Sequence, residues 1–375
     1  MSDKSVLNIG IVCGEHSGDR LGAGLIRELK KNYEINLYGV GGPKLENLGL
    51  KSSFHFSEIN IMGLLDPLLK ISKLLSLREN LVNLFIKKKI DFFIGIDSPD
   101  FNMGIHKALK KSSTNKNIQV VSPSVWGWRQ KRIKSIQSYI DLTLCLFKFE
   151  HDFYKKVGHN SFHLGHPFYK LIKENKEEII QKYSLNDSKK YLCILPGSRK
   201  SEVRNMMPIY LEFVKKHYKN HKDYFYLISS ADKKLTPEIE KYFDLTSKDL
   251  PIMIAEESTR DFLSLSSLSI VTSGTATLEA SILECPPVIC YKTNFLNYSI
   301  ISRMLKIDDV GLPNLLLGKR YYLELIQKEC NAKNILDAVT ETEDKIQFSS
   351  EQARLIRLMI KGRGYSEAVR AITAI

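Results

Sequence analysis

Short apolar runs alternate along the chain with longer stretches in which apolar positions recur at helical spacing. An apolar run at residues 6–13 is followed by a helical pattern at residues 19–31. Further strand-like runs lie at residues 36–40, 91–96, 118–121 and 142–147. Strands and helices that alternate in this way predict a parallel sheet with helices on both faces.

The alternation starts again after a charged, helical stretch at residues 171–190. Strand-like runs follow at residues 191–195, 224–229, 252–255, 268–272 and 288–291. Two such halves predict an α/β chain of two Rossmann-like domains that face each other across a cleft. In sheets of this kind, ligands bind at the carboxyl ends of the strands.

These patterns also predict the domain boundaries. We expect an N-terminal domain at residues 1–170 and a C-terminal domain at residues 171–345. Residues 351–375 have one helical pattern. Residues 346–375 are therefore expected to contain a C-terminal helix that packs back on the N-terminal domain or on a partner chain, which would give a homodimer.

The composition is that of a globular protein, with 43% hydrophobic and 26% charged residues among 375. No apolar run is long enough to span a bilayer, the start has no signal-peptide pattern, and the six cysteines form no CxxC pair. These features indicate a cytoplasmic protein with reduced thiols. Most of the net charge of +13 lies in the first half. This favours an anionic partner (nucleic acid, a phosphorylated substrate or a membrane), unless it is only a solvated surface.

Residues 61–89 combine many leucines with six basic and two acidic residues. A basic, leucine-rich amphipathic segment is a candidate for the interface of an anionic bilayer. We therefore predict peripheral membrane binding that involves Leu68 and Leu69, with Pro67 dividing the segment. The alternative is a pair of core helices with lysines at the rim.

Two polar turns directly follow strand-like runs in the first half. Residues 14–19 read Gly-Glu-His-Ser-Gly-Asp, where glycines permit a tight turn and the next helix offers N–H groups to an anion. A helix cap at Ser17 or Asp19 is the alternative. The second turn places Asp97 at the end of a strand, where a carboxylate suits a general base. We place the base at Asp97 rather than at Asp100, which can cap the next helix.

Both tryptophans of the chain lie in residues 122–129, beside a cluster of basic side chains. Trp126 and Arg129 could stack on nucleic-acid bases. The same spacing fits a loop that stacks on a sugar, with cations behind it for a phosphate. Structural packing of the tryptophans is the third interpretation.

Two turns of the second half also follow strands and open helices. The first, Leu-Pro-Gly-Ser-Arg, offers backbone donors and one guanidinium to a diphosphate. The second, Thr-Ser-Gly-Thr-Ala-Thr-Leu-Glu, offers another anion site, and its glutamate is placed either to accept from ribose hydroxyls or to lie on a helix face. The candidate residues are Ser198, Arg199, Ser273, Gly274, Thr275 and Glu279.

No metal ion or other cofactor is expected. His159, His163 and His166 are three and four residues apart, but on a strand-and-turn stretch, and no Asp-x-Asp sequence occurs in the chain. The spacing therefore gives no set of ligands for a metal-bound diphosphate.

Taken together, the motifs resemble those of the lipid A disaccharide synthase family. In order along the chain they are CGEHSGD, GVGGP, IDSPDFN, SPSVWGWRQKR, GHP, LPGSRKSE, TSGTATLE and LPNLL. The resemblance implies a GT-B type glycosyltransferase fold and an inverting transfer. UDP-2,3-diacylglucosamine would be the donor and 2,3-diacylglucosamine 1-phosphate the acceptor, joined through its 6-hydroxyl at the cytoplasmic face of the inner membrane.

The resemblance also implies roles for individual residues. Asp97 would be the base, the two phosphate-type turns would hold UDP, and Glu279 would hold the ribose. Asn314 and Gln327, with Glu324 one turn earlier, would complete the donor site. The acceptor side would be lined by Glu15, Ser17, Trp126 and Arg129. Two departures from the family pattern, at residues 62–67 and 147–150, affect the start of a local helix and a loop.

Two other classes of function remain open at this point. Another UDP-sugar glycosyltransferase or an epimerase could use the same fold, but an epimerase needs no acceptor and would not release UDP in response to one. An RNA-binding protein would show salt-sensitive RNA affinity that survives the loss of Arg199. The motif set favours the glycosyltransferase and no nucleic-acid partner.

Overall fold

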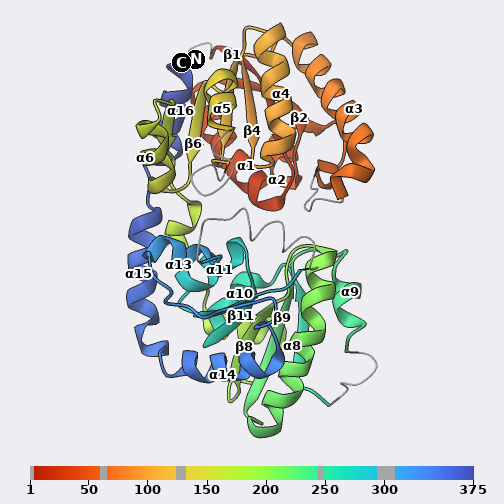
Figure 1. Ribbon diagram of the computed structural model, residues 1–375, viewed down its shortest axis with the longest axis vertical. Helices are drawn as coiled ribbons and strands as arrows, with labels where there is room; N and C mark the ends of the chain where they lie inside the picture. The colour runs from red at the N-terminus through yellow and green to blue at the C-terminus, as the bar shows by residue number, and fades with distance from the viewer. Residues whose placement is uncertain (1–3, 60–65, 124–131, 244–248, 294–308) are drawn as a thin grey trace. The chain divides into compact units, whose positions relative to one another are not determined.

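The computed structural model describes residues 4–59, 66–123, 132–243, 249–293 and 309–375 (Figure 1). These residues form two compact units. Unit 1 contains the described residues up to Pro167 together with Ile360–Ile375, and unit 2 contains those from Phe168 to Met359. Each unit is built around its own parallel sheet.

The sheet of unit 1 has seven strands in the order β3-β2-β1-β4-β5-β6-β7. The strands are β1 (Val6–Cys13), β2 (Glu34–Val40), β3 (Lys51–Ser52), β4 (Phe92–Ile96), β5 (Lys116–Val120), β6 (Leu142–Cys145) and β7 (Ser161–His163). From β1 the chain builds β2 and β3 on one side, then crosses over to build β4 to β7 on the other. The strand order therefore reverses between β1 and β4, where Cys13 pairs with Ile96.

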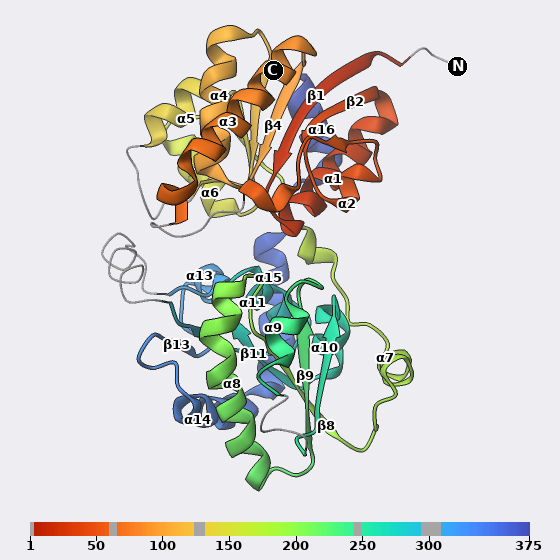
Figure 2. The same ribbon diagram turned by 90° about the vertical axis from the view of Figure 1, so that its right-hand side faces the viewer.

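Helices cover both faces of this sheet. They are α1 (His16–Asn32), α2 (Pro43–Glu46), α3 (Asp66–Lys87), α4 (Pro99–Ser112), α5 (Ile133–Tyr139), α6 (Lys148–Lys156) and α16 (Gly364–Thr373). Helices α3 and α4 pack side by side on one face, and α1 and α16 lie on the other (Figure 2). Phe85 of α3, Phe93 of β4 and Ile105 of α4 belong to one buried cluster. The apolar stripes of the helices thus meet strands that are buried along their length.

Helix α3 forms the part of the amphipathic segment that the structure describes. The described helix runs without a break from Asp66 to Lys87. The division of the segment at Pro67 stays a prediction, because the residues directly before Asp66 are not described. Residues 60–65, and the side chains of Leu68 and Leu69, lie outside the described part of the chain.

The sheet of unit 2 has six parallel strands in the order β10-β9-β8-β11-β12-β13. The strands are β8 (Lys190–Leu195), β9 (Tyr224–Ser230), β10 (Ile252–Glu256), β11 (Leu268–Thr272), β12 (Pro287–Tyr291) and β13 (Glu324–Ile326). The order reverses between β8 and β11, as it does between β1 and β4 in unit 1. Each unit therefore has its own topological switch point.

The helices of unit 2 also lie on both faces of its sheet. They are α7 (Lys176–Tyr183), α8 (Lys200–Asn220), α9 (Thr236–Glu240), α10 (Thr259–Leu265), α11 (Thr275–Ile282), α13 (Leu312–Leu317), α14 (Ala332–Glu343) and α15 (Ser349–Ile360). Helices α8 and α14 share one buried cluster with the strands, to which Tyr210, Phe213 and Ile335 contribute. This cluster contains no residue of unit 1, so unit 2 has a core of its own.

The C-terminal stretch forms two helices rather than the single helix expected. Helix α15 ends at Ile360 and α16 begins at Gly364, which has a left-handed φ of +81°. Gly362 lies against the backbone of Gly165, where a Cβ atom on Gly362 would come within 2.2 Å of the Gly165 nitrogen. Helix α16 packs against α1 of unit 1, whereas almost all of α15 belongs to unit 2. The break allows the chain to return to the first unit.

Two strands, β3 and β13, were absent from the sequence prediction, and β7 was expected only as part of a strand-and-turn stretch, because each has only two or three residues. The placement of Glu324 one helical turn before Gln327 is wrong, since Glu324–Ile326 is a strand. All six cysteines are buried and unpaired. Among the described residues, no helix has the length and apolar character needed to cross a membrane.

Candidate active site

The proposed base stands at the switch point of unit 1. Asp97 directly follows β4, and its backbone N–H donates to the carbonyl of Val120 at 3.0 Å, extending the ladder to β5. Asp97 and Ser98 then take left-handed backbone angles, with φ of +51° and +42°. This turn ends the strand and starts α4 at Pro99. The carboxylate is thereby brought to the edge where ligands bind in open α/β sheets.

A buried layer of amide side chains supports this turn from behind. Asn102 Nδ2 donates to the carbonyl of Asp97 at 2.8 Å, and Gln119 Nε2 lies 3.2 Å from the same oxygen. Gln119 Nε2 is also 3.3 Å from the carbonyl of Val121, a third left-handed residue with φ of +68°. Gly95 leaves room for the layer, because a Cβ atom there would lie 3.0 Å from Gln119 Oε1.

A neutral histidine completes the layer. His106 Nε2 lies 3.1 Å from Gln119 Oε1, and since a carbonyl oxygen only accepts, the histidine donates. Burial lowers the pKa of His106 to about 4. The imidazole is therefore uncharged at neutral pH and acts as a fixed donor that orients the Gln119 amide toward the turn.

The turn after β1 lies next to the turn that holds Asp97. A Cβ atom on Gly14 would come within 2.8 Å of Ser98 Oγ. Glu15 is half-buried and precedes α1 as its cap residue, while Ser17 is exposed in its first turn. The structure thus brings Glu15 and the Asp97 turn to adjacent strand ends of one sheet.

The alternative interpretation of this motif was that Asp19 caps α1, but the structure shows another role for it. Its buried carboxylate instead accepts the N–H groups of Gly42, Lys44 and Leu45 at 2.8–3.1 Å. These groups form the start of α2, so Asp19 caps a helix that follows it by more than 20 residues. Trp126 and Arg129 belong to residues 124–131, which lie outside the described residues.

In unit 2, the first phosphate-type turn follows β8 at the switch point. Gly197 has a left-handed φ of +115°, and Arg199 precedes α8 as its cap residue. A carboxylate that the sequence prediction did not include, Glu202, accepts from the backbone N–H of Ser198 at 2.9 Å and from the Arg199 guanidinium at 2.7 Å. These are the donors expected for a diphosphate, and Glu202 orients them together.

The second phosphate-type turn follows β11, the other strand of this switch point. Ser273 donates its N–H to the carbonyl of Cys290 in β12 at 2.9 Å. The next two residues, Gly274 and Thr275, are exposed at the start of α11. A Cβ atom on Gly274 would have no neighbour within 4 Å. The start of α11 is therefore accessible to an anion.

Glu279 is largely buried, which argues against the reading as an exposed helix-face charge. Its carboxylate lies 3.4 Å from Nε of Arg260, a residue of α10 that the sequence prediction did not include. Arg260 follows β10 at the same carboxyl edge of the sheet as α11. The pair holds the Glu279 carboxylate one turn inside the second phosphate-type turn.

Asn314 and Gln327 have different environments. The Asn314 amide is fully buried and uses all its hydrogen-bonding capacity within the protein, with Tyr322, Glu324 and the N–H groups of residues 321 and 322. It therefore positions a loop. Gln327 is left-handed, with φ of +54°, and its Oε1 accepts from Thr293 at 3.2 Å. Its Nε2 is buried without a hydrogen-bond partner, as expected of a donor that serves a ligand.

Metal ligands do not cluster in the part of the chain that the structure describes. His159 is buried against Thr143, and His166 is buried beside Phe147. Burial lowers the pKa of His159 to about 4 and that of His166 to about 3. The three-and-four spacing of the histidines thus reflects packing around β7.

Both units carry their polar turns where the strand order reverses, with a carboxylate in one and two phosphate-type turns in the other. Two Rossmann-like units with this arrangement define a nucleotide-sugar enzyme of the GT-B fold. Solved structures support the fold: a Staphylococcus aureus MnaA–UDP co-structure matches with a TM-score of 0.65 and 15% identity over 98% of this chain and 96% of that one. Acinetobacter baumannii MurG matches with a TM-score of 0.55 and 11% identity over 99% and 100%.

Closer sequence relatives define the family. The family model described as lipid-A-disaccharide synthetase matches residues 9–371. Lipid-A-disaccharide synthase 2 of Legionella pneumophila strain Philadelphia 1 is 37% identical over 95% of this chain and 92% of its own length. The lipid-A-disaccharide synthase of Acinetobacter baylyi is 38% identical over 88% and 86%. The chain belongs to the lipid-A-disaccharide synthase family, which confirms the resemblance seen in its motifs.

Proposed function

We propose that this protein transfers 2,3-diacylglucosamine from UDP to the 6-hydroxyl of 2,3-diacylglucosamine 1-phosphate, a step of lipid A biosynthesis. The observation that carries the proposal is the pair of switch points. Asp97 follows β4 in unit 1, and the Arg199 and Gly274 turns follow β8 and β11 in unit 2. Family membership supplies the identity of the two sugars.

The chemistry assigned to these residues is a single displacement. Asp97 takes the proton of the acceptor 6-hydroxyl as its oxygen attacks C1 of the donor sugar, and the bond from C1 to the UDP oxygen breaks. One displacement at C1 inverts its configuration. The negative charge that grows on the diphosphate is stabilised by the Arg199 guanidinium and the N–H groups of the two turns.

This stabilisation requires no divalent cation, because a guanidinium and oriented N–H groups supply the positive charge that a metal would provide. Activity is therefore expected to persist in excess chelator. Loss of activity in chelator with recovery in magnesium would contradict this part of the proposal.

We also propose that unit 1 binds the surface of an anionic membrane through α3. In the C-terminal half of α3, Leu81 and Phe85 are buried, although Ile86 is 38% exposed. In its N-terminal half, Ile71 and Leu75 each remain 51% exposed. Exposed apolar residues next to lysines are typical of helices that lie in a bilayer interface. The proposed substrates carry acyl chains and partition into membranes. An enzyme that uses them therefore has to reach the bilayer surface, and such a helix would bind there.

Mass spectrometry tests the activity directly. The protein is mixed with UDP-2,3-diacylglucosamine and 2,3-diacylglucosamine 1-phosphate, each also supplied alone. A disaccharide 1-phosphate that forms only with both substrates, together with one UDP per disaccharide, is the expected result. Because epimerases share the fold, a product formed from the UDP-sugar alone would favour that alternative and contradict a transferase.

A further inference from the structure

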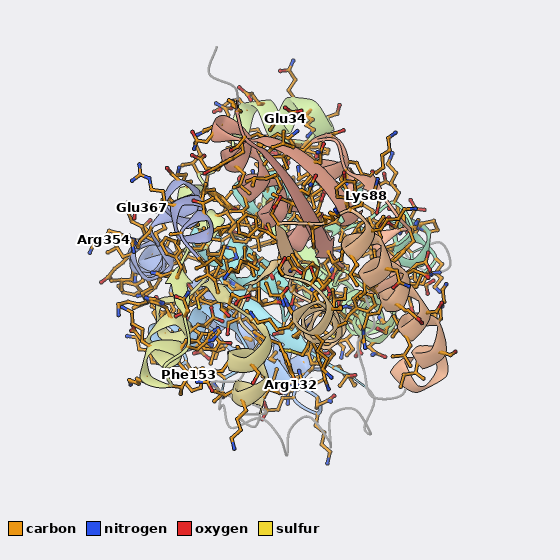
Figure 3. The ribbon with its side chains drawn as sticks, turned by 90° about the horizontal axis from the view of Figure 1, so that it is seen from above. Glu34, Lys88, Arg132, Phe153, Arg354 and Glu367 are labelled. Atoms are coloured by element: carbon orange, nitrogen blue, oxygen red, sulfur yellow. The ribbon has the colours of Figure 1, made fainter. Side chains whose placement is uncertain are left out.

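Two arginines, one on α3 and one directly before α5, flank Asp100 at the start of α4. Arg78 of α3 donates from Nη2 to the backbone carbonyl of Asp100 at 3.4 Å, and its guanidinium lies 5.4 Å from the ring centroid of Phe101. Arg132, which is labelled in Figure 3, directly precedes α5 and pairs with the Asp100 carboxylate. Helices α3, α4 and α5 therefore bring two cations to one place near the end of β4.

Gly104 leaves the space that the Arg78 guanidinium occupies. A Cβ atom at this position would come within 2.5 Å of three atoms of the Arg78 guanidinium group. Glycine in the interior of a helix costs about 1 kcal/mol relative to alanine. Helix α4 thus contains an unfavourable residue at the point where the arginine approaches its backbone.

Arg78 is held there with few hydrogen bonds. Its Nε is buried and has no partner, and its bond to the Asp100 carbonyl is long. Burial lowers the pKa of Arg78, while the nearby Asp100 acts in the opposite direction. A partly desolvated guanidinium with unused donors is stabilised by an anion that accepts two hydrogen bonds at once.

The position of this arginine pair relates it to the acceptor. Asp100 is three residues after Asp97 and lies in the first turn of α4, the end of the helix where the peptide dipoles favour an anion. Of the two proposed substrates, the acceptor carries a phosphate monoester, and UDP is assigned to the turns of unit 2. Among the residues that the structure describes, no cation has so far been assigned to the acceptor phosphate.

We propose that Arg78 and Arg132 bind the phosphate monoester of the acceptor sugar, an assignment that rests on the proposed function. The exposed Asp100 carboxylate keeps Arg132 in place when no acceptor is bound. The phosphate, which has the higher charge, replaces it as the partner of Arg132 and satisfies the unused donors of Arg78. The phosphate is then bound beside Asp100, which is three residues after the base Asp97 in the chain. This holds the acceptor sugar near the base.

A comparison of two acceptors tests the assignment. Short-chain 2,3-diacylglucosamine 1-phosphate and the same sugar without phosphate are used in solution, with no bilayer present. The wild type is expected to prefer the phosphorylated acceptor. Arg78→Ala and Arg132→Ala should each lower kcat/KM for it by roughly 10- to 100-fold, mainly through KM, because a charge-assisted hydrogen bond is lost. With the unphosphorylated acceptor, kcat/KM should change by less than about twofold.

Gly104→Ala provides a test that does not depend on removing a charge. The new methyl group displaces the Arg78 guanidinium, while alanine favours the helix, so the variant should fold and still lose the preference for phosphate. Lys111→Ala is the matched control, since it removes a cation from the exposed far end of the same helix. It should retain the preference.

Three results would give the arginines another role. Equal losses with both acceptors would mean that the arginines only support the fold. Weaker UDP binding by Arg78→Ala would assign the pair to the donor, and loss of binding to anionic vesicles with the phosphate preference intact would assign it to lipid headgroups. If the wild type forms no disaccharide with either acceptor, the proposed function fails, and this assignment fails with it.

Discussion

Asp97 and Ser98 are consecutive non-glycine residues with left-handed backbone angles. Such angles ordinarily cost an L-residue about 1 kcal/mol or more. Here the Asp97 carbonyl accepts from Asn102 and lies within reach of Gln119. Backbone strain that the surrounding residues stabilise at a strand end is common at functional sites. This supports the assignment of Asp97 as the base, which substitution of the residue can test.

Asp97→Asn should lower kcat by roughly 10²- to 10⁴-fold, because the amide has nearly the same shape but cannot take a proton. UDP affinity and the melting temperature should remain close to those of the wild type. Product formation under saturating donor measures the first quantity, and calorimetry measures the other two. If Asp97→Ala remains active while Asp100→Ala is the more damaging change, the base is misassigned.

Arg199→Ala should weaken UDP binding by roughly 10- to 100-fold, since one charge-assisted pair with the diphosphate is lost. Arg199→Lys should restore only part of the affinity, because an ammonium cannot form two parallel hydrogen bonds. Titration calorimetry with UDP measures both effects. Lys200→Ala, which removes the exposed neighbouring cation, is the control and should bind UDP normally. Equal weakening by Lys200→Ala would indicate a general charge effect.

At the scale of elements, the amide layer connects β4, β5 and α4. Gln119→Leu should lower kcat by about 10-fold and reduce the free energy of unfolding by about 1–3 kcal/mol, because the carbonyls of Asp97 and Val121 lose a donor in a buried place. Activity is measured well below the melting temperature, and UDP affinity in unit 2 is the internal control. A fall in kcat that only follows the fraction of folded protein would mean that the layer has no part in positioning Asp97.

Helix α3 buries Leu81 and Phe85 in its C-terminal half and exposes Ile71 and Leu75 in its N-terminal half. Replacing Ile71 and Leu75 together by Ser should weaken binding to anionic vesicles by about 10-fold or more, because apolar area that enters the bilayer is lost. Activity on long-chain substrates should fall more than activity on short-chain analogues. Vesicle flotation and paired assays measure these effects.

Leu358→Ser is the control for α3. Leu358 lies on α15 in unit 2 and is 62% exposed, so its replacement removes a similar apolar side chain from another surface. Vesicle binding should be unaffected by it. If the α3 variant binds vesicles as the wild type does, or loses both activities equally, the membrane proposal fails.

At the scale of the whole molecule, both units bury neutral histidines. Burial lowers the pKa of His106 and His159 in unit 1, and of His217 in unit 2, to about 4. In an unfolded chain these groups bind protons near pH 6.5. Their contribution to stability is thus complete above that pH and is lost as the pH falls from about 6.5 to about 4.

Urea unfolding at pH 7.5 and pH 5 should therefore show a lower free energy of unfolding at the acidic pH. His106→Gln keeps a donor for Gln119 but cannot titrate, so it should reduce the pH dependence of unit 1. The full effect of this histidine is about 3 kcal/mol by linkage. An unchanged pH dependence in the variant would show that His106 is not the group that titrates.

The sequence by itself determined most of the strands, the division of the chain into two α/β halves, the order of the motifs and hence the family. These features depend on local patterns: apolar runs of four or more residues and turns that follow them. The strands β3 and β13 escaped this reasoning because two or three residues carry no periodicity. Likewise, the break before Gly364 depends on the close approach of Gly362 to Gly165, which no local pattern reveals.

Only the tertiary structure decided which side chains act together. Asp19 caps α2, Arg260 pairs with Glu279, and Gln119 supports Asp97. Arg78 reaches α4 because Gly104 leaves space, although neither residue lies in a polar turn. The physical reason is that hydrogen bonds and ion pairs act over a few ångströms, and the fold alone brings residues separated by tens of positions within that range.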